Sequence, residues 1–500
     1  MPMAQGAGTV VEERYEPVIG LEVHAQMRTA TKAFCTCPTS FGDDPNTNVC
    51  PVCLGLPGAL PVLNARLVDF VLRLGLATGC SVAPRSTFAR KNYFYPDLPK
   101  GYQISQFDTP ICAGGAVEID LDDGTRKTVG ITRIHMEEDA GKSIHDLGMD
   151  TLVDLNRCGV PLIEIVSEPD LRSPREAYQY LARVRQLVTY LGICDGNMEE
   201  GSLRCDANVS LRVRGTTAFG TKTEVKNMNS FRNVERALEF EIRRQARVLD
   251  EGGRVVQETL LWDANQNVAA PMRSKEEAHD YRYFPEPDLV PVVVGPETVG
   301  KVRREVPELP AAKRDRYVDA LGLPRYDADV LTAEPEPAAY FEETLEKFAG
   351  LTGKPPRECA KAAGNWVMTE VLRAVAERKS TVSSFPLRPD RLAGMLALIQ
   401  DGTISGKIAK DLFEEMITTP DAPDVIVRRK GMVQVSDEGA IEKVVTDVIA
   451  ANPKQVQKYR DGNDKVLGFF VGETMKVMQG RANPGMVNAI LRKKLGSPGT

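Results

Sequence analysis

The sequence predicts an α+β protein, in which a β-rich N-terminal domain is followed by an all-helical domain and a small helical tail domain. First, residues 15–295 contain short runs of alternating apolar and polar residues separated by Gly and Pro turns, as strands do. Second, strand-like runs disappear after residue 295 and helical periodicity takes over. Third, Ile441, Val445 and Val448 recur near the end of the chain at the spacing of one helix face.

These patterns divide the chain into a flexible leader (1–14), a β-rich domain (15–295), a helical domain (296–428) and a helical tail (429–500). In the β-rich domain we predict strands at 18–27, 116–121, 131–136, 162–166 and 203–213, and helices at 174–191 and 231–249. The first of these helices opens with Ser173 as a candidate N-cap and Pro174 in its first turn.

The tail is predicted to be a compact three-helix module. Asn452 and Pro453 stop its first helix, and Asn483 and Pro484 provide an N-cap and first turn for its last helix.

Composition narrows the functional class. The chain has 500 residues, 42% of them hydrophobic and 26% charged, with a net charge of −6. That charge argues against a protein that coats nucleic acid indiscriminately, although a local basic patch stays possible. No apolar run approaches the ~20 residues of a membrane span, and no secretion signal is visible. Most of the ten cysteines are scattered singly, which indicates a reducing compartment and predicts a cytoplasmic protein without a membrane partner.

Acidic residues and one histidine stand in three separate strand-like segments. Glu22 and His24 point the same way from one strand, and Glu164 occupies the middle of a run apolar enough to be buried. Glu137 and Glu138 are adjacent on another segment, so only one of them can face a given cluster. Carboxylates with an imidazole suit Mg²⁺ or Mn²⁺ better than Zn²⁺. The alternative is a solvated strand face with a core salt bridge.

Neither common phosphate-binding loop is present. Residues 140–143 read Ala-Gly-Lys-Ser, but Met136 stands where a P-loop needs its first glycine. On the strand at 203–213, Arg204 and Asp206 share a polar face that could line a substrate cavity or simply be a wet surface. The segments 91–97 and 280–288 mix aromatic and charged residues, which suits either stacking on unpaired bases or loop packing.

Four cysteines form two close pairs. Cys35 and Cys37 are followed, after a turn-rich stretch, by Cys50 and Cys53. This spacing is typical of a structural Zn²⁺ site in which all four ligands are thiolates, so the ion would brace the fold and would not catalyse. The alternative is four ordinary thiols.

Six of these stretches together closely resemble the B subunit of the tRNA-dependent amidotransferases, the GatB/GatE family. They are VIGLEVH (18–24), RKNYFYPD (90–97), YQISQFD (102–108), HMEEDAGKS (135–143), VDLNRCGVPLIEI (153–165) and EEGSLRCDAN (199–208). The similarity runs from about residue 16 to residue 495. It implies a cradle-shaped catalytic domain, then a helical domain and a small helical tail.

The resemblance also implies a reaction. Such a protein uses ATP to phosphorylate the side-chain carboxylate of misacylated Glu-tRNA(Gln) or Asp-tRNA(Asn), and ammonia from a partner amidase then displaces the phosphate. Implied partners in a heterotrimer are the amidase (A) subunit and the small (C) subunit, because this chain lacks the Gly-Gly-Ser-Ser stretch of an amidase. ATP, Mg²⁺ and a structural Zn²⁺ are the implied cofactors.

Residue roles follow from the matched motifs. The resemblance places Mg²⁺ on His24, Glu138 and Glu164, with Glu22 and Glu137 adjoining. Strand alternation favours Glu137 for the cluster; the resemblance favours Glu138, which we adopt here because alternation is weak beside a glycine turn. Catalytic roles would fall to Glu138, Glu137 and Lys91, and substrate or ATP contacts to Lys91, Arg204 and Asp206.

The tail is predicted to bind tRNA. Residues 451–500 hold nine basic and three acidic residues, a local net charge of +6, whereas the whole chain carries −6. Candidate phosphate contacts are Lys454, Lys458, Arg460, Lys476 and Arg481. Two rival interpretations of the whole chain are a zinc-braced tRNA-binding scaffold without chemistry and a stand-alone ligase that needs no partner.

Overall fold

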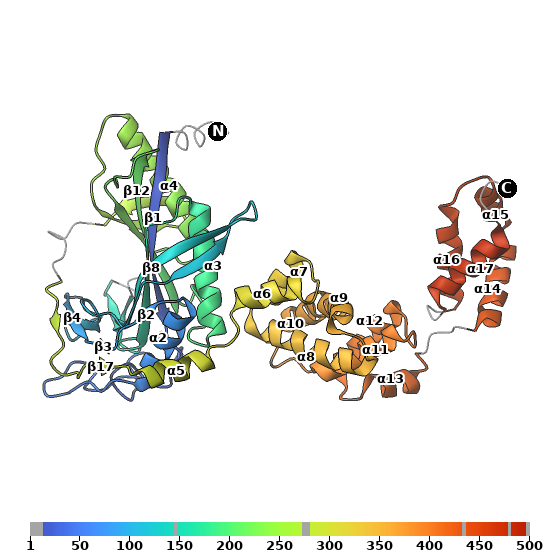
Figure 1. Cartoon of the computed structure of the whole chain (residues 1–500), viewed down its shortest axis with the longest axis horizontal. Coiled ribbons are helices and arrows are strands. Elements are labelled where there is room, and N and C mark those ends of the chain that lie inside the picture. The colour runs from blue at the N-terminus through green and yellow to red at the C-terminus, as the bar shows by residue number, and fades with distance from the viewer. Residues whose placement is uncertain (1–13, 145–148, 273–280, 433–436, 479–481, 497–500) are drawn as a thin grey trace. The chain divides into compact units, whose positions relative to one another are not determined.

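The computed structural model describes residues 14–144, 149–272, 281–432, 437–478 and 482–496, so the predicted leader lies almost wholly outside the described residues. The chain divides into two compact units, Met1–Pro310 and Ala311–Thr500. Figure 1 shows a first unit rich in strands and a second built of helices. The predicted α+β fold class is confirmed.

A large twisted sheet organises the first unit, and the 12-residue strand β1 (Tyr15–Gln26) lies inside it. β1 pairs antiparallel with β12 (Leu203–Val213) on one side and with β11 (Pro161–Ser167) on the other. The sheet order is β15 (Val268–Pro271), β14 (Thr259–Asp263), β13 (Thr223–Lys226), β12, β1, β11, β8 (Arg126–Glu138), β6 (Cys112–Ala113) and β2 (Ser81–Val82), with β7 (Ala116–Asp120) also paired to β8.

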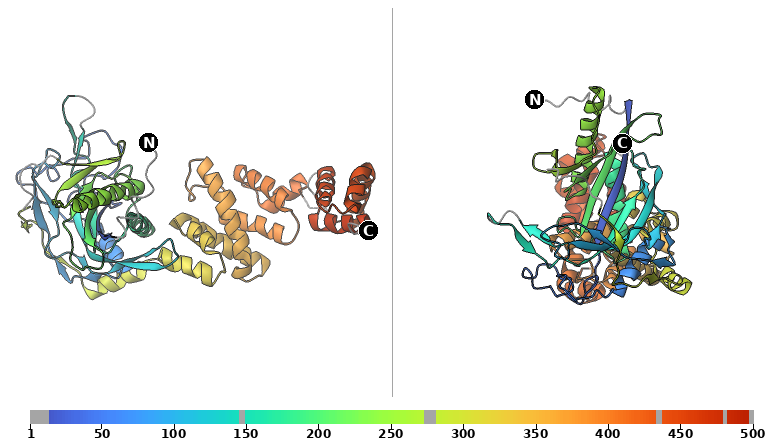
Figure 2. Two further views of the ribbon diagram at one scale, coloured as in Figure 1. Left: turned by 90° about the horizontal axis from the view of Figure 1, so that it is seen from above. Right: turned by 90° about the vertical axis from the view of Figure 1, so that its left-hand side faces the viewer.

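Helices cover one face of this sheet. They are α2 (Ala65–Ala77), α3 (Pro174–Tyr190) and α4 (Phe231–Asp250), and Figure 2 shows α3 and α4 alongside the strands. α3 begins as the sequence predicts, with Pro174 in its first turn and the Ser173 side chain accepting a hydrogen bond from the backbone N–H of Glu176. Leu21, Val23 and Ala25 of β1 enter the apolar core under these helices, so the polar residues between them face the opposite way.

A small three-stranded sheet packs on that opposite, polar face. Its order is β16 (Phe284–Pro285), β4 (Ala89–Asn92) and β5 (Tyr102–Ser105), and β5 contacts β8 of the large sheet. Two further pairs of short strands complete the unit: β9 (Lys142–Ile144) with β10 (Leu152–Asp154), and β3 (Arg85–Ser86) with β17 (Val292–Val293). The large sheet and the small sheet thus enclose a layer of polar side chains that are shielded from water.

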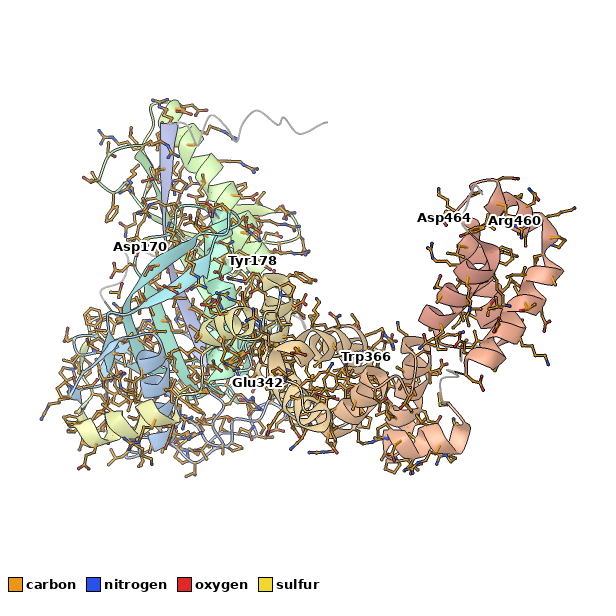
Figure 3. All side chains as sticks on the ribbon, turned by 45° about the vertical axis from the view of Figure 1, so that its right-hand side comes forward. Asp170, Tyr178, Glu342, Trp366, Arg460 and Asp464 are labelled. Carbon is orange, nitrogen blue, oxygen red and sulfur yellow. The ribbon has the colours of Figure 1, made fainter. Side chains whose placement is uncertain are left out.

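The described residues of the second unit are helical and form two separate apolar cores. The first core extends from Tyr317 to Val427 and includes the ring pair Trp366 and Phe413 (Figure 3 labels Trp366). Its helices are α6 (Pro310–Asp319), α7 (Arg325–Leu331), α8 (Pro335–Thr352), α9 (Pro356–Trp366), the π-turn η1 (Val367–Val371), α10 (Leu372–Glu377), α11 (Pro389–Gln400), α12 (Gly406–Thr418) and α13 (Pro423–Lys430).

The second of these cores belongs to the tail and runs from Ile441 to Leu495. The described residues of the tail form four helices where the sequence predicts three: α14 (Glu438–Ala451), α15 (Pro453–Arg460), α16 (Val466–Val477) and α17 (Pro484–Leu495). Pro453 ends α14 but also starts α15, because proline is tolerated in the first turn of a helix.

The predicted boundary after residue 295 differs from the division seen in the structure. The helix α5 (Pro296–Glu305) packs on α2, Val302 joins the core of the first unit, and Arg73 forms a 2.9 Å ion pair with Glu305. The first unit accordingly continues to Pro310. Within the described residues, no helix combines the length and apolar character that crossing a membrane requires.

Candidate active site and thiol cluster

Two histidines and two glutamates meet on the polar face of the large sheet. Cross-strand pairing sets His24 of β1 beside Glu164 of β11, and Glu164 beside His135 of β8. Glu137 lies two residues beyond His135 and therefore shares its face. The Nε2 atom of His135 is 3.1 Å from Oε1 of Glu137 and 3.3 Å from Oε2 of Glu164, and Nε2 of His24 is 3.5 Å from Oε2 of Glu164.

Burial makes the charged forms of these side chains unfavourable unless opposite charges lie beside them. Glu137 is 2% exposed and Glu164 is 5% exposed, so both carboxylates have lost most of their water. Burial raises the pKa of Glu164, but His135 and His24 outweigh that effect and hold it well below its usual range. Burial also lowers the pKa of His135, yet the negative charge of Glu164 and Glu137 raises it to about 9. The two anions thus survive burial because cationic groups surround them.

The small sheet supplies the other wall. Gln103 donates to Oε2 of Glu137 at 3.0 Å, and Ser105 donates to Oε1 of Glu137 at 2.5 Å. Lys91 faces the same side as Gln103, its cross-strand partner. Burial works against the charged ammonium of Lys91, but the carboxylates of Glu137 and Glu164 outweigh it and raise the pKa of Lys91. Lys91 is therefore a fixed positive charge beside the cluster.

A cavity of about 220 Å³ opens onto this cluster. Its lining includes His24, Lys91, Tyr93, Gln103, Glu137, Asp139, Arg204 and Asp206. A second cavity of about 260 Å³ lies further along β1, and Glu22 borders it. Asn208 donates to Oε1 of Glu22 at 2.9 Å, so Glu22 adjoins the cluster without joining it.

The predicted substrate-contact residues of β12 both face the first cavity. The guanidinium of Arg204 donates to both oxygens of Asp139, at 2.8 and 3.0 Å. Asp206 accepts a 2.6 Å hydrogen bond from Lys226. Each is held by a partner of opposite charge, which fixes its direction before any substrate arrives.

Glu138, which the motif resemblance assigns to the metal cluster, lies elsewhere. The antiparallel pairing of β8 with β11 continues without interruption through Glu138, so its side chain points to the face opposite Glu137. There it pairs with the Lys100 ammonium and accepts a 2.9 Å hydrogen bond from the backbone N–H of Ile104. The alternation along the strand, and not the motif position beside the glycine, indicates the correct side.

Three residues that contribute to the site were not predicted from the sequence: His135, Gln103 and Ser105. His135 could have been found by the same alternation that pairs it with Glu137. Gln103 and Ser105 share one face of a strand for the same reason, but nothing local shows that this strand lies over β8. Their role depends on a contact between two sheets.

The donor set fits a hard divalent cation. His24, Glu137 and Glu164 each offer one ligand atom, and these atoms lie within 4.8 Å of one another. Two carboxylate oxygens and one imidazole nitrogen suit Mg²⁺ or Mn²⁺, which keep further positions for water and phosphate oxygens.

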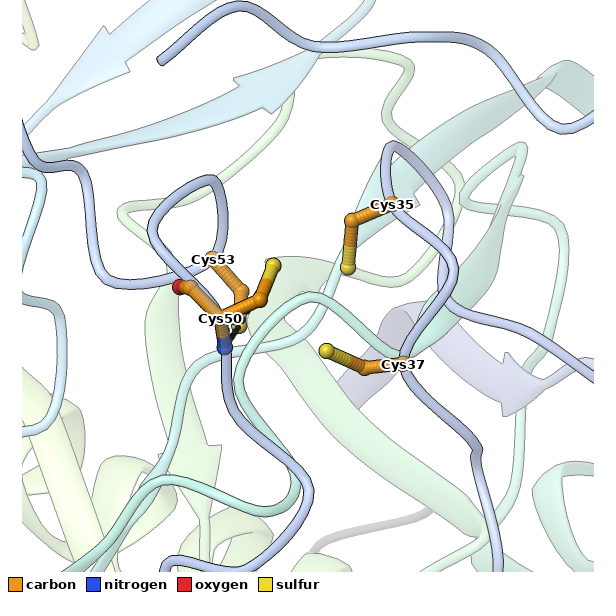
Figure 4. Close-up of side chains that lie close together, drawn as sticks. All are labelled: Cys35, Cys37, Cys50 and Cys53. Carbon is orange, nitrogen blue, oxygen red and sulfur yellow. Dashed lines mark hydrogen bonds between the residues drawn. The ribbon is translucent and has the colours of Figure 1, made fainter.

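The four predicted thiol ligands also come together. Cys35, Cys37, Cys50 and Cys53 form no disulfide, and their sulfurs lie within 4.8 Å of one another (Figure 4). The Sγ atoms of Cys50 and Cys53 are 3.9 Å apart, close to the separation of about 3.8 Å that tetrahedral Zn–S bonds impose. The hydrogen bond from Cys35, with help from the backbone of Cys50 and from Lys32, lowers the pKa of Cys53 to about 4. A thiolate is the form that binds Zn²⁺.

Lys32 is built into this thiol cluster. Its side chain is fully buried, and its ammonium lies 2.6 Å from the carbonyl oxygen of Asn48 and 3.7 Å from Sγ of Cys53. In the described parts of the chain, no carboxylate lies within ion-pair distance of it. A buried cation needs a negative partner, and four thiolates around Zn²⁺ would provide a net charge of about −2.

The predicted tRNA contacts lie on the surface of the tail. Lys454, Lys458 and Arg460 are exposed on α15, and Lys476 is exposed on α16. Figure 3 shows Arg460 at the outside of the helices. Arg481 falls outside the described residues.

A buried carboxylate–imidazole cluster with a lysine, set in a cavity between two sheets, is typical of enzymes that bind a divalent cation together with a phosphorylated substrate. Comparison with known proteins shows that the chain belongs to the GatB/GatE family. The GatB/GatE catalytic domain matches residues 17–300, and the GatB domain matches residues 340–495.

Curated relatives match nearly the whole chain. The B subunit of the aspartyl/glutamyl-tRNA(Asn/Gln) amidotransferase from Prosthecochloris aestuarii is 58% identical over 481 residues, which cover 96% of this chain and 98% of that protein. The protein of the same name from Geobacter sulfurreducens is 58% identical over 485 residues, covering 96% of this chain and 99% of its own length. The resemblance stated from the six motifs is thus confirmed.

Proposed function

We propose that this chain is the component of a glutamine-dependent aminoacyl-tRNA amidotransferase that activates the misattached amino acid. Its substrates would be Glu-tRNA(Gln), Asp-tRNA(Asn) or both, and its products the corresponding Gln-tRNA and Asn-tRNA. The names of the relatives support the overall reaction. The use of ATP, and the partnership with an amidase (A) subunit and a small (C) subunit in the cytoplasm, are part of the proposal.

The single observation that carries the proposal is the cluster of His24, Glu137 and Glu164, two of whose members, His24 and Glu137, line one cavity with Lys91. A carboxylate is a poor electrophile. Transfer of the terminal phosphoryl group of ATP to the substrate carboxylate gives an acyl phosphate and ADP, and ammonia then displaces phosphate to leave the amide. The protein must hold several negative charges together while this happens.

Each wall of the cavity has a part in that task. A bound Mg²⁺ on His24, Glu137 and Glu164 would supply positive charge to the phosphate oxygens. Lys91 adds a second positive charge, which would stabilise the negative charge that develops on the phosphoryl oxygens. Gln103 keeps the Glu137 carboxylate in one orientation, which is the usual work of a residue behind a metal ligand. Arg204 offers its guanidinium at the cavity wall for the substrate carboxylate or a phosphate.

Two adjacent glutamates provide the test. Glu137→Gln removes a cluster ligand while preserving shape, so we expect acyl-phosphate formation on misacylated tRNA to fall roughly a hundredfold or more. Glutamine hydrolysis by the partner amidase should persist. The measurement follows tRNA-dependent transfer of a labelled γ-phosphate in the purified complex.

Glu138→Gln is the matched control. It leaves the Lys100 ammonium buried with a weaker partner, so it should lower stability by roughly 3 kcal/mol without removing a cluster ligand. The folded fraction should retain acyl-phosphate formation. Full activity of Glu137→Gln would refute the proposal, and equal tRNA binding without any activation in the wild-type complex would favour the scaffold interpretation.

A further inference from the structure

A continuous row of aromatic rings leads from the wall of the active-site cavity to the surface. It starts at Tyr93, which lines the cavity, and continues through Tyr281 and Tyr283 to Phe107. Ring centroids are 6.1 Å apart between Tyr93 and Tyr281 and 6.0 Å apart between Tyr281 and Tyr283. Phe107 and Tyr283 are stacked, with centroids 4.1 Å apart and planes within 7°. We call these four residues the aromatic row.

The row is fixed to the scaffold of the site. The backbone N–H of Asn92 donates to the carbonyl oxygen of Tyr281 at 3.0 Å, and Phe284 pairs with Arg90 in the small sheet. The same strand β4 carries Lys91, whose ammonium lies 5.0 Å from the centroid of the Tyr281 ring. The aromatic row and Lys91 are therefore held in a fixed position relative to each other.

The outer end of the row is open to solvent. Phe107 is 45% exposed, although a phenylalanine gains by being covered. Glu137 and Glu164 of the cluster, in contrast, are buried. Tyr93 lines the cavity, so a molecule bound there meets the inner end of the row.

The proposed substrate has a shape that matches this arrangement. An extended glutamyl group spans only about 5 Å from its ester carbon to its side-chain carboxyl carbon. When that carboxylate sits at the cluster, the ribose and the last base of the tRNA must lie at the cavity mouth. That base is unpaired, and unpaired bases are commonly bound by stacking on aromatic side chains.

Resting on the proposed function, we infer that the aromatic row is the binding site for the terminal adenine of the aminoacyl-tRNA, with the stacked ring pair of Phe107 and Tyr283 as its stacking surface. Recognition of the last base would set the depth to which the aminoacyl group enters. The row is thus a substrate-positioning site and takes no part in phosphoryl transfer.

The test measures binding without turnover. Complete amidotransferase complex is titrated with deacylated tRNA and with the same tRNA lacking its 3′-terminal adenosine. In the wild type we expect the shortened tRNA to bind about tenfold more weakly or worse, as loss of one base–aromatic stack would cause. In the double variant Phe107→Ala/Tyr283→Ala the two tRNAs should bind equally well.

Two controls accompany the double variant. Tyr283→Phe keeps the ring and should retain the full preference for the complete tRNA. Phe41→Ala removes an exposed phenylalanine outside the aromatic row and should also leave the preference unchanged.

The inference is overturned if the double variant still prefers the complete tRNA to the wild-type extent. It is also overturned if the double variant loses its amidase partner, because the rings would then belong to a protein interface. Failure of the proposed function would look different: the wild-type complex would distinguish the two tRNAs but form no acyl phosphate.

Discussion

Lys32 shows how much a single buried charge can reveal about a site. With Zn²⁺ on the four cysteines, the lysine offsets the negative charge of the thiolates. Without the metal, less negative charge faces the ammonium, whose neighbours are then two carbonyl oxygens and Sγ of Cys53. The lysine should therefore stabilise the zinc-bound protein more than the metal-free protein.

Substituting this lysine tests that idea. Lys32→Met retains a long side chain but no charge, so we expect the affinity for Zn²⁺ to fall roughly 10- to 100-fold. The substitution should at the same time lower the unfolding temperature of the zinc-bound protein more than that of the metal-free protein. Competition with a chromophoric chelator and thermal unfolding measure the two effects. Lys301→Met, on the exposed surface of α5, should change neither; an unaltered affinity in Lys32→Met would remove the lysine from the metal site.

Single residues also mark the limit of what the sequence can predict. His24 can be assigned because it shares the polar face of an alternating strand with Glu22. Glu164 can be assigned because it interrupts an apolar run, where an unused carboxylate would be costly. Glu138 is misplaced when a motif is given more weight than the alternation of the strand that carries it. The role of Lys32 cannot be predicted, because nothing in the neighbouring sequence indicates that this lysine is buried.

At the scale of elements, the thiol cluster braces the loop that leads into β11. The backbone N–H of Ala33 donates to the carbonyl oxygen of Gly159 at 2.9 Å, and the thiol of Cys158 lies 3.3 Å from the carbonyl oxygen of Cys53. Gly159 has a φ of +84°, which other residues adopt only with strain. β11 starts two residues later and carries Glu164 into the cluster.

Removal of the metal should loosen this connection. We expect chelation to accelerate amide hydrogen exchange at Cys158 and Gly159, whose N–H groups bond within and beside the loop, and to leave exchange in α17 unchanged. Metal analysis before chelation should find about one zinc per chain. Unaltered exchange after complete removal of zinc would show that the four cysteines do not support β11.

Elements are predictable where one face is apolar. The alternation in β1 and β12 and the apolar run of β11 can be read directly from the sequence, and Ser173 and Pro174 mark the start of α3. The short strands β4 and β5 show no comparable periodicity, and their position over β8 follows from tertiary contacts alone. The sequence thus points to one wall of the site but not to the other.

At the scale of the whole molecule, the basic tail raises the question of where the body of the tRNA is held. The tail has its own core, from Ile441 to Leu495, so removing residues 437–500 should leave both other cores intact. We expect this truncation to flatten the dependence of tRNA affinity on salt and to raise KM for aminoacyl-tRNA, because fewer phosphates release counterions. Glutamine hydrolysis should not change.

A charge variant separates the role of the basic residues from that of the fold. Lys454→Glu/Lys458→Glu should reproduce part of the truncation's effect, with the salt slope reduced by roughly two. Lys347→Glu/Lys407→Glu places the same charge change on exposed positions of the helical core and should have a smaller effect. Truncated complex that binds tRNA with unaltered affinity and salt slope would show that the tail serves another purpose.

The close packing of Lys32 against the thiol cluster predicts which positions should change together in evolution. A lineage that loses the four cysteines would keep a charged side chain sealed in the protein with nothing to oppose it, and selection should then replace the lysine as well. Conversely, a chain that keeps all four cysteines has a reason to keep the lysine. Position 32 and the four thiol positions should therefore be gained and lost together among relatives, although the lysine binds no metal itself.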